Sequence, residues 1–105
     1  MSSYSVIQYR PDLTGESINV AVVVNDGMGY YGCRVTSDWE RVKVFSRLDN
    51  MTPLSEWVFA TIQDFAVGKP ILQNDRLRFT DFRRSTLPPG QLIDEISRLM
   101  LEGRV

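Results

Sequence analysis

The guanidinium groups of this sequence are the side chains best suited to specific chemistry. Arg10, Arg34, Arg76 and Arg78 each stand next to branched or aromatic residues in a short apolar segment. A guanidinium group presents five N–H donors in a planar fork, which matches the geometry of carboxylate and phosphate groups. Because arginine and aromatic residues are enriched where proteins bind one another, this pattern predicts a binding surface.

Two polar motifs beside apolar segments offer a second kind of site. Glu16 and Asn19 lie at the entrance to a run of valines, and Arg84-Ser85-Thr86 follows an aromatic segment. The arginine and hydroxyl groups of the second motif could bind phosphate. A structural role competes in each case, because a polar pair at a strand entrance commonly ties down the preceding loop, and Ser85 or Thr86 can cap a turn. We favour the structural role for both motifs.

The common catalytic constellations lack their residues in this chain. It has no histidine and a single cysteine, Cys33, which excludes imidazole zinc sites, Ser-His and Cys-His pairs, and an internal disulfide. The carboxylates fall on the polar faces and ends of predicted helices without metal-like spacing, and no glycine-rich phosphate loop is present. We therefore predict a protein that is not an enzyme and that holds no metal or cofactor.

The composition is that of one globular domain spanning residues 1–105. Hydrophobic residues make up 43% of the chain and charged residues 24%, which argues against disorder. The net charge of -1 does not favour broad attraction to nucleic acid or to anionic membranes. The N-terminus does not resemble a signal peptide, and no run approaches the ~20 apolar residues that span a bilayer. A cytoplasmic location is expected.

The elements that must position these residues follow from local periodicity and turn residues. Asp26-Gly27 predicts a hairpin between two strands, and Gly68 followed by Pro70 ends a helix. The predicted strands are 4–10, 17–24, 30–35 and 76–82. The predicted helices are 38–48, 53–67 and 88–103. This β-β-β-α-α-β-α order predicts an α+β fold, a two-layer sandwich of an antiparallel sheet of about four strands and three helices lying mainly on one face.

Strict alternation along each strand divides the sheet into two faces. In the second strand it places Ile18, Val20, Val22 and Val24 against the helices, and Asn19 on the other face. That second face is expected to be open and to combine polar with apolar side chains. Its members would be Arg10, Arg34, Arg76, Arg78, Gln8, Asn19, Thr80, Tyr4, Val6, Tyr30, Ala21, Val23 and Phe82. The face could bind a protein, stack single-stranded nucleic acid, or simply be solvated.

Two segments resemble a known bacterial family, the domain-of-unknown-function 3037 family. They are YSVIQYRPDLTGESINVAVVV and LRFTDFRRSTL, followed by a closing helix at LIDEISRLM. The family has no established activity, so the resemblance implies a fold more than a function. The positions that match its motifs are Glu16, Asn19, Arg84, Ser85 and Thr86. Members are often encoded beside HipA-like kinase-domain proteins, and the resemblance therefore implies a partner role.

These observations together predict a module that binds another protein through the open sheet face. On the resemblance alone, that partner would be a kinase-like toxin, with this chain as its partner or inhibitor subunit. Nucleic-acid binding through the same arginines is the alternative, and the oligomeric state is left open. The predicted partner-binding residues are Arg10, Asn19, Tyr30, Arg34, Arg76, Arg78 and Phe82.

Overall fold

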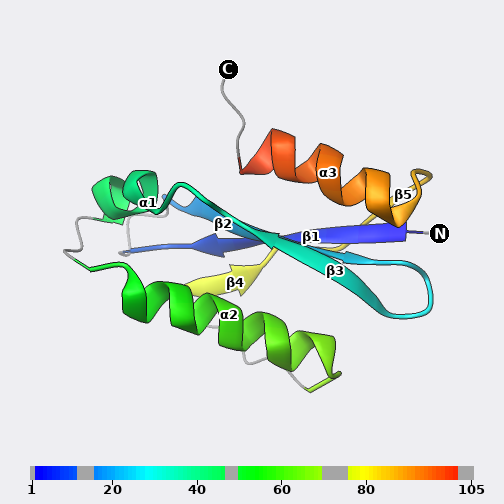
Figure 1. Cartoon of the computed structure of the whole chain (residues 1–105), viewed down its shortest axis with the longest axis horizontal. Coiled ribbons are helices and arrows are strands. Elements are labelled where there is room, and N and C mark those ends of the chain that lie inside the picture. The colour runs from blue at the N-terminus through cyan, green and yellow to red at the C-terminus, as the bar shows by residue number, and fades with distance from the viewer. Residues whose placement is uncertain (1, 12–15, 47–49, 70–75, 102–105) are drawn as a thin grey trace.

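The structure is a computed structural model that describes residues 2–11, 16–46, 50–69 and 76–101. The predicted α+β class, the antiparallel sheet and the order of the elements are confirmed (Figure 1). The predicted strand 76–82 is shorter in the structure, and a further short strand follows it at 83–85, where no strand was predicted. The end of the predicted helix 38–48 lies outside the described residues. The strands are β1 (Ser2–Tyr9), β2 (Ile18–Asn25), β3 (Tyr30–Val35), β4 (Leu77–Phe79) and β5 (Arg83–Ser85). The helices are α1 (Trp39–Ser46), α2 (Thr52–Ala66) and α3 (Pro89–Met100).

The sheet is antiparallel throughout, with the strand order β3-β2-β1-β4. β5 continues the β4 edge by pairing with the first half of β1. Thr80, between these two strands, explains the interruption. Its hydroxyl accepts the N–H of Val6 at 3.0 Å, and its carbonyl accepts the hydroxyl of Ser5 at 2.6 Å. Side-chain hydrogen bonds thus replace part of the backbone ladder where the edge strand bends.

A β-bulge in β2 reverses the face to which its valines point. Ile7 of β1 pairs with Ala21 and Gln8 pairs with Asn19, so Val20 has no single partner across the ladder. An extra residue of this kind shifts the alternation by one position. Val20 and Ala21 therefore pack on the same side, in one hydrophobic cluster with Ile18 and Val23, whereas Val22 and Val24 belong to a second cluster. Strict alternation was wrong for this strand.

The two hydrophobic clusters lie on opposite faces of the sheet. The first contains Val42 of α1 and Leu54, Val58 and Ile62 of α2. The second contains Leu92, Ile93 and Ile96 of α3, packed on β1 and β2. Figure 1 shows α2 and α3 on the two sides of the sheet. The expected open second face does not exist, because α3 covers it and makes a third layer.

The amphipathic pattern of α3 could not by itself indicate which face of the sheet it would cover. The β-bulge supplies the reason for the choice, since it turns Val22 and Val24 toward this side. Two apolar faces then need cover, and helices on both sides bury them. Among the described helices, none is both long and apolar enough to cross a membrane.

Candidate functional site

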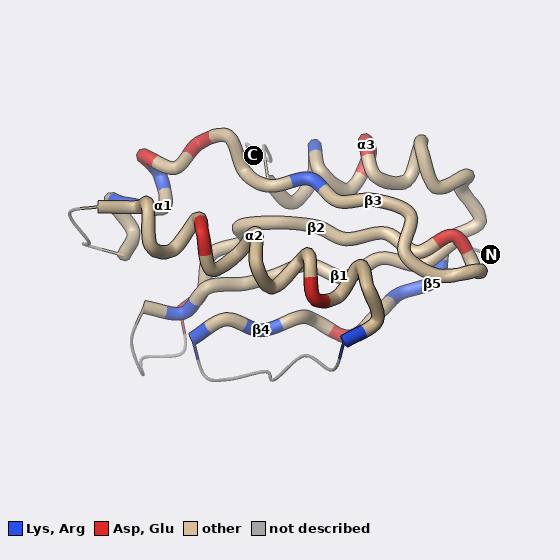
Figure 2. The backbone as a smooth tube through the Cα atoms, turned by 60° about the horizontal axis from the view of Figure 1, so that its bottom comes forward, with Lys and Arg blue, Asp and Glu red and all other residues tan. Residues whose placement is uncertain are grey.

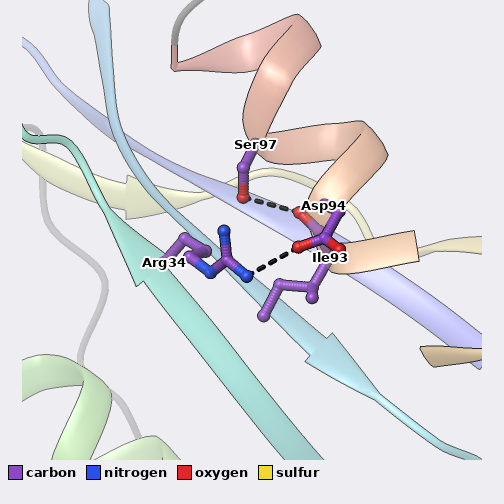
Figure 3. Close-up of polar contacts among 4 residues, drawn as sticks. All are labelled: Arg34, Ile93, Asp94 and Ser97. Atoms are coloured by element: carbon purple, nitrogen blue, oxygen red, sulfur yellow. Dashed lines mark hydrogen bonds and ion pairs between the residues drawn. The ribbon is translucent and has the colours of Figure 1, made fainter. Parts of the chain in front are cut away.

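The predicted arginines lie around α3 rather than on an open surface. Arg34 stands opposite Val22 in the β2–β3 ladder, and its guanidinium pairs with Asp94 of α3 at 2.6 Å (Figure 3). Arg78 stands opposite Gln8, whose amide donates to Asn19 at 3.0 Å, and it therefore shares the face that α3 covers. α3 separates Arg34 on one edge strand from Arg78 on the other, so the two do not form one continuous binding surface.

Arg10 and Arg76 meet where β1 leaves the sheet. The N–H of Arg10 donates to the carbonyl of Arg76 at 2.7 Å, and a guanidinium N–H of Arg76 donates to the carbonyl of Pro11. The Nε of Arg10 is buried without a hydrogen-bond partner among the described residues. These contacts tie the end of β1 to the start of β4, which is a structural role for both residues.

The predicted aromatic anchors Tyr30 and Phe82 lie on the opposite side of the sheet, where α2 packs. The ring of Phe82 stacks on Phe65 of α2 with a centroid distance of 5.7 Å. The ring of Tyr30 meets the same Phe65 edge-on at 5.9 Å, and Phe79 completes the group. The expectation that Tyr30 and Phe82 share a face with the arginines was wrong, because the alternation is broken by the register shift at Tyr31 and by the interruption between β4 and β5.

The environment of Tyr30 has a consequence for its ionisation. Partial burial raises its pKa to about 12, and a hydrogen bond and the charge of Cys33 add to the effect. A folded-state pKa above the ordinary value of 10.0 favours the neutral phenol. The stability that this group contributes is therefore fully present below pH 10 and is lost as the pH rises toward 12.

Replacing Tyr30 by phenylalanine should remove an absorbance step near pH 12 in an alkaline titration of the folded protein. The loss of stability between pH 10 and 12 should also become smaller in this variant, because one titrating group is gone. Tyr31→Phe is the matched control, since Tyr31 is the exposed chain neighbour and its removal should leave the step near pH 12 in place. If the titration curve above pH 11 is the same in Tyr30→Phe as in the wild type, the raised pKa does not belong to Tyr30.

Asn19 attaches the end of α3 to the sheet. Its amide nitrogen donates to the carbonyl of Met100 at 3.1 Å, and its amide oxygen accepts from Gln8. Arg41 of α1 donates to the next carbonyl, that of Leu101, at 3.3 Å. The last carbonyls of a helix have no intrahelical partner, so these side chains cap α3. Asn19 thus has a structural role in holding α3 to the sheet, and the loop that it was predicted to tie down, 12–15, lies outside the described residues.

Of the remaining family-motif residues, one stabilises a turn and the others have exposed side chains. The hydroxyl of Ser85 accepts the N–H of Leu87 at 3.1 Å, which stabilises the turn before α3. Arg84 pairs across the ladder with Ser3, and its side chain is exposed, as are those of Glu16 and Thr86. This turn agrees with the prediction that Ser85 has a structural role.

The sheet edge formed by β4 and β5 is rich in positive charge. The sequence analysis did not predict this, because it assigned residues to the two faces of the sheet and not to its edges. Arg76, Arg78, Arg83 and Arg84 follow one another in this stretch, with Asp81 as its only carboxylate. Figure 2 shows basic residues along β4 and β5. We call these four arginines together with Phe82 the arginine edge. Among the described residues, Arg78, Arg83 and Arg84 have no carboxylate within ion-pair distance. Arg83 was not among the predicted site residues, although four arginines within nine positions were a visible signal.

Two concave sites flank α3. The smaller, of about 210 Å³, lies beside Asn19 and includes Gln8, Thr80 and Arg83. The larger is a groove of about 1040 Å³ between α3, the end of β3 and the start of α1. Arg34 pairs with Asp94 along this groove, and Arg98 pairs with Glu95, both at 2.6 Å. Its wall also contains Arg41 and Asp38, so positive and negative side chains are balanced in it.

Comparison with known proteins gives a family assignment without a function. No curated protein and no solved structure matches the chain. A family model described as protein of unknown function (DUF3037) matches residues 4–85, from β1 to the end of β5. This match covers most of the chain, including all of the first segment that carries the resemblance and the second up to Ser85, so that Thr86 lies outside it. The chain therefore belongs to the DUF3037 family of proteins of unknown function.

Proposed function

We propose that this protein is a non-enzymatic interaction module that binds an acidic surface of another protein through the arginine edge. The observation that carries the proposal is the exposure of Arg78, Arg83 and Arg84 without ion-pair partners among the described residues. In a chain whose net charge is -1, this concentration of positive charge on one sheet edge is a local exception. Guanidinium groups free to bind carboxylates bidentately would orient such a partner.

Phe82 gives the same edge an apolar anchor. Its side chain is 41% exposed although its ring stacks on Phe65. A ring held in place by a neighbour loses little conformational freedom when a partner covers it. Aromatic and arginine side chains supply most of the binding energy in typical interfaces, and here they are adjacent in sequence.

The partner that the family resemblance implies, a HipA-like kinase-domain protein, is the first candidate to test. The same arginines would also bind phosphate groups, which keeps nucleic acid as the competing ligand. The sheet no longer supports that alternative as a stacking platform, because α3 covers the face on which bases would stack. The support for a protein partner is the combination of free arginines with an exposed, fixed aromatic ring.

The test is a quantitative pull-down with the tagged chain, with nuclease added, followed by a binding titration against the recovered partner. Replacing Arg78, Arg83 and Arg84 together by glutamine should weaken binding at least a hundredfold. Phe82→Ala should cost about 2 kcal/mol or more, roughly thirtyfold in affinity, if it acts as an anchor. The matched control replaces Lys43, Lys69 and Arg98 by glutamine, which changes the net charge equally at sites away from this edge.

The outcomes separate the possible ligands. A partner lost from the arginine variant but retained by the control supports the proposal. Recovery of the same protein by both variants with equal affinity would refute it. A complex that disappears with nuclease and weakens steeply with salt would assign the arginine edge to nucleic acid instead.

A further inference from the structure

The outer edge of β3 is the second exposed border of the sheet. The N–H of Thr36 donates to the carbonyl of Val20 at 2.8 Å, which fixes the direction of the backbone groups in this ladder. Because these groups alternate along a strand, those of Arg34 point toward β2, and those of Cys33 and Val35 point away from it. Figure 1 shows β3 crossing in front of β1 and β2, with α2 and α3 to either side.

The outward backbone groups of Cys33 and Val35 are free to accept another strand. Within the described part of the chain, no backbone hydrogen bond reaches the outward N–H or carbonyl of either residue. Unpaired groups of this kind are a template for a further strand, since only an extended backbone presents donors and acceptors at the matching spacing. The occupant of this edge is therefore an extended segment.

The charges beside β3 favour a second copy of this chain as the source of that strand. The groove next to β3 carries Arg34, Arg41 and Arg98 together with an equal number of carboxylates from Asp38, Asp94 and Glu95. In a two-fold dimer, the same surface of each copy faces the other. A surface with equal numbers of positive and negative groups can form such a contact, whereas a surface with charges of one sign would repel its own copy. The arginine edge on the other side of the sheet would repel its own copy, so pairing is restricted to β3.

We propose that two copies of this protein pair antiparallel through β3 and form one continuous sheet with two-fold symmetry. Centring the pairing on Cys33 lets each copy's Cys33 exchange both backbone hydrogen bonds with the other. This register sets Arg34 opposite Gly32 of the second copy, whereas a register centred on Arg34 would set two arginines directly opposite each other. Like charges in that position are destabilising. Among the described strands, each copy then has only its arginine edge left, so the dimer is closed.

The test compares two substitutions at Val35 by sedimentation equilibrium over a wide range of protein concentrations. Val35→Pro removes an outward N–H, which costs no hydrogen bond inside the chain but prevents the ladder between copies. Val35→Ala is the matched control, since it shortens the side chain and keeps the N–H. The wild type and Val35→Ala should form dimers, and Val35→Pro should dissociate at least a hundredfold more readily. Circular dichroism and thermal melting would establish that each variant is folded.

Amide hydrogen exchange on the unmodified chain gives an independent measurement. The amide of Cys33 should become protected as the concentration rises, and that of Arg34, which faces β2, should be protected at every concentration. A chain that stays monomeric with a freely exchanging Cys33 amide would overturn the proposal, as would a dimer that Val35→Pro leaves intact. Assembly into species larger than a dimer would also overturn it. Dimerisation should survive the arginine-to-glutamine variant, which separates this test from that of the proposed function.

Discussion

Replacing Leu92 by alanine should lower the free energy of unfolding by about 2–5 kcal/mol, the range for a truncated core leucine. Leu92 is 1% exposed and lies in the cluster between α3 and the sheet, with Val6, Val22 and Val24. Truncation would remove buried apolar area and leave a cavity that the neighbouring valines, stiff at χ1, cannot readily fill. Urea unfolding followed by circular dichroism would measure the loss, provided that the transition is two-state.

Leu99→Ala is the control for this prediction, because Leu99 belongs to the same helix and is 53% exposed. Its truncation should change the free energy of unfolding by no more than about 0.5 kcal/mol. The pair of variants tests the third layer directly. Equal, small effects at both positions would mean that α3 does not bury this face of the sheet, and the open surface expected from alternation would have to be reconsidered.

Replacing Asn19 by aspartate should cost about 2–3 kcal/mol at neutral pH. The change keeps the acceptor that Gln8 uses but replaces the N–H donor facing the Met100 carbonyl with a carboxylate oxygen. It also sets a negative charge at the C-terminal end of α3, where the helix dipole is itself negative. Chemical unfolding at pH 7 would show the loss.

The pH dependence and a second asparagine make this prediction specific. Repulsion in the folded state raises the pKa of the introduced carboxyl above its unfolded value of about 4, so the deficit should shrink as the pH falls through the folded-state pKa toward about 4. Asn50→Asp is the matched control. The amide oxygen of Asn50 accepts the N–H of Thr52 at the start of α2, and a carboxylate there keeps the acceptor and suits the dipole. That variant should be neutral or slightly more stable; an equal loss at both positions would contradict the capping role of Asn19.

Burial of both sheet faces restricts where this protein can bind others. With helices on each side, the surfaces left for partners are the sheet edges and the outer helix faces. The two edges differ in chemistry, since one presents arginines and a phenylalanine and the other presents free backbone groups beside balanced charges. The two proposals above assign them different occupants for that reason.

Local sequence patterns were sufficient for the class and the order of the elements. Asp26-Gly27 predicts the hairpin, and in the structure Gly27 has a φ of 94° while the N–H of Asp26 donates to the carbonyl of Gly29. The spacing of Leu54, Val58 and Ile62 predicts α2, and all three are buried. These features depend on residues within a few positions of one another, so their causes are contained in short stretches of sequence.

Only the tertiary structure decided which face each residue occupies. The bulge at Val20 depends on how β2 registers against β1, and neither strand alone contains that information. It reverses the valine alternation, creates a second apolar face and so determines where α3 packs. Thr80 likewise splits the edge strand through contacts with Ser5 and Val6, more than seventy positions away, and thereby turns Phe82 toward α2. Contacts between distant segments have no signature in local periodicity, because their energy arises only once the segments have met.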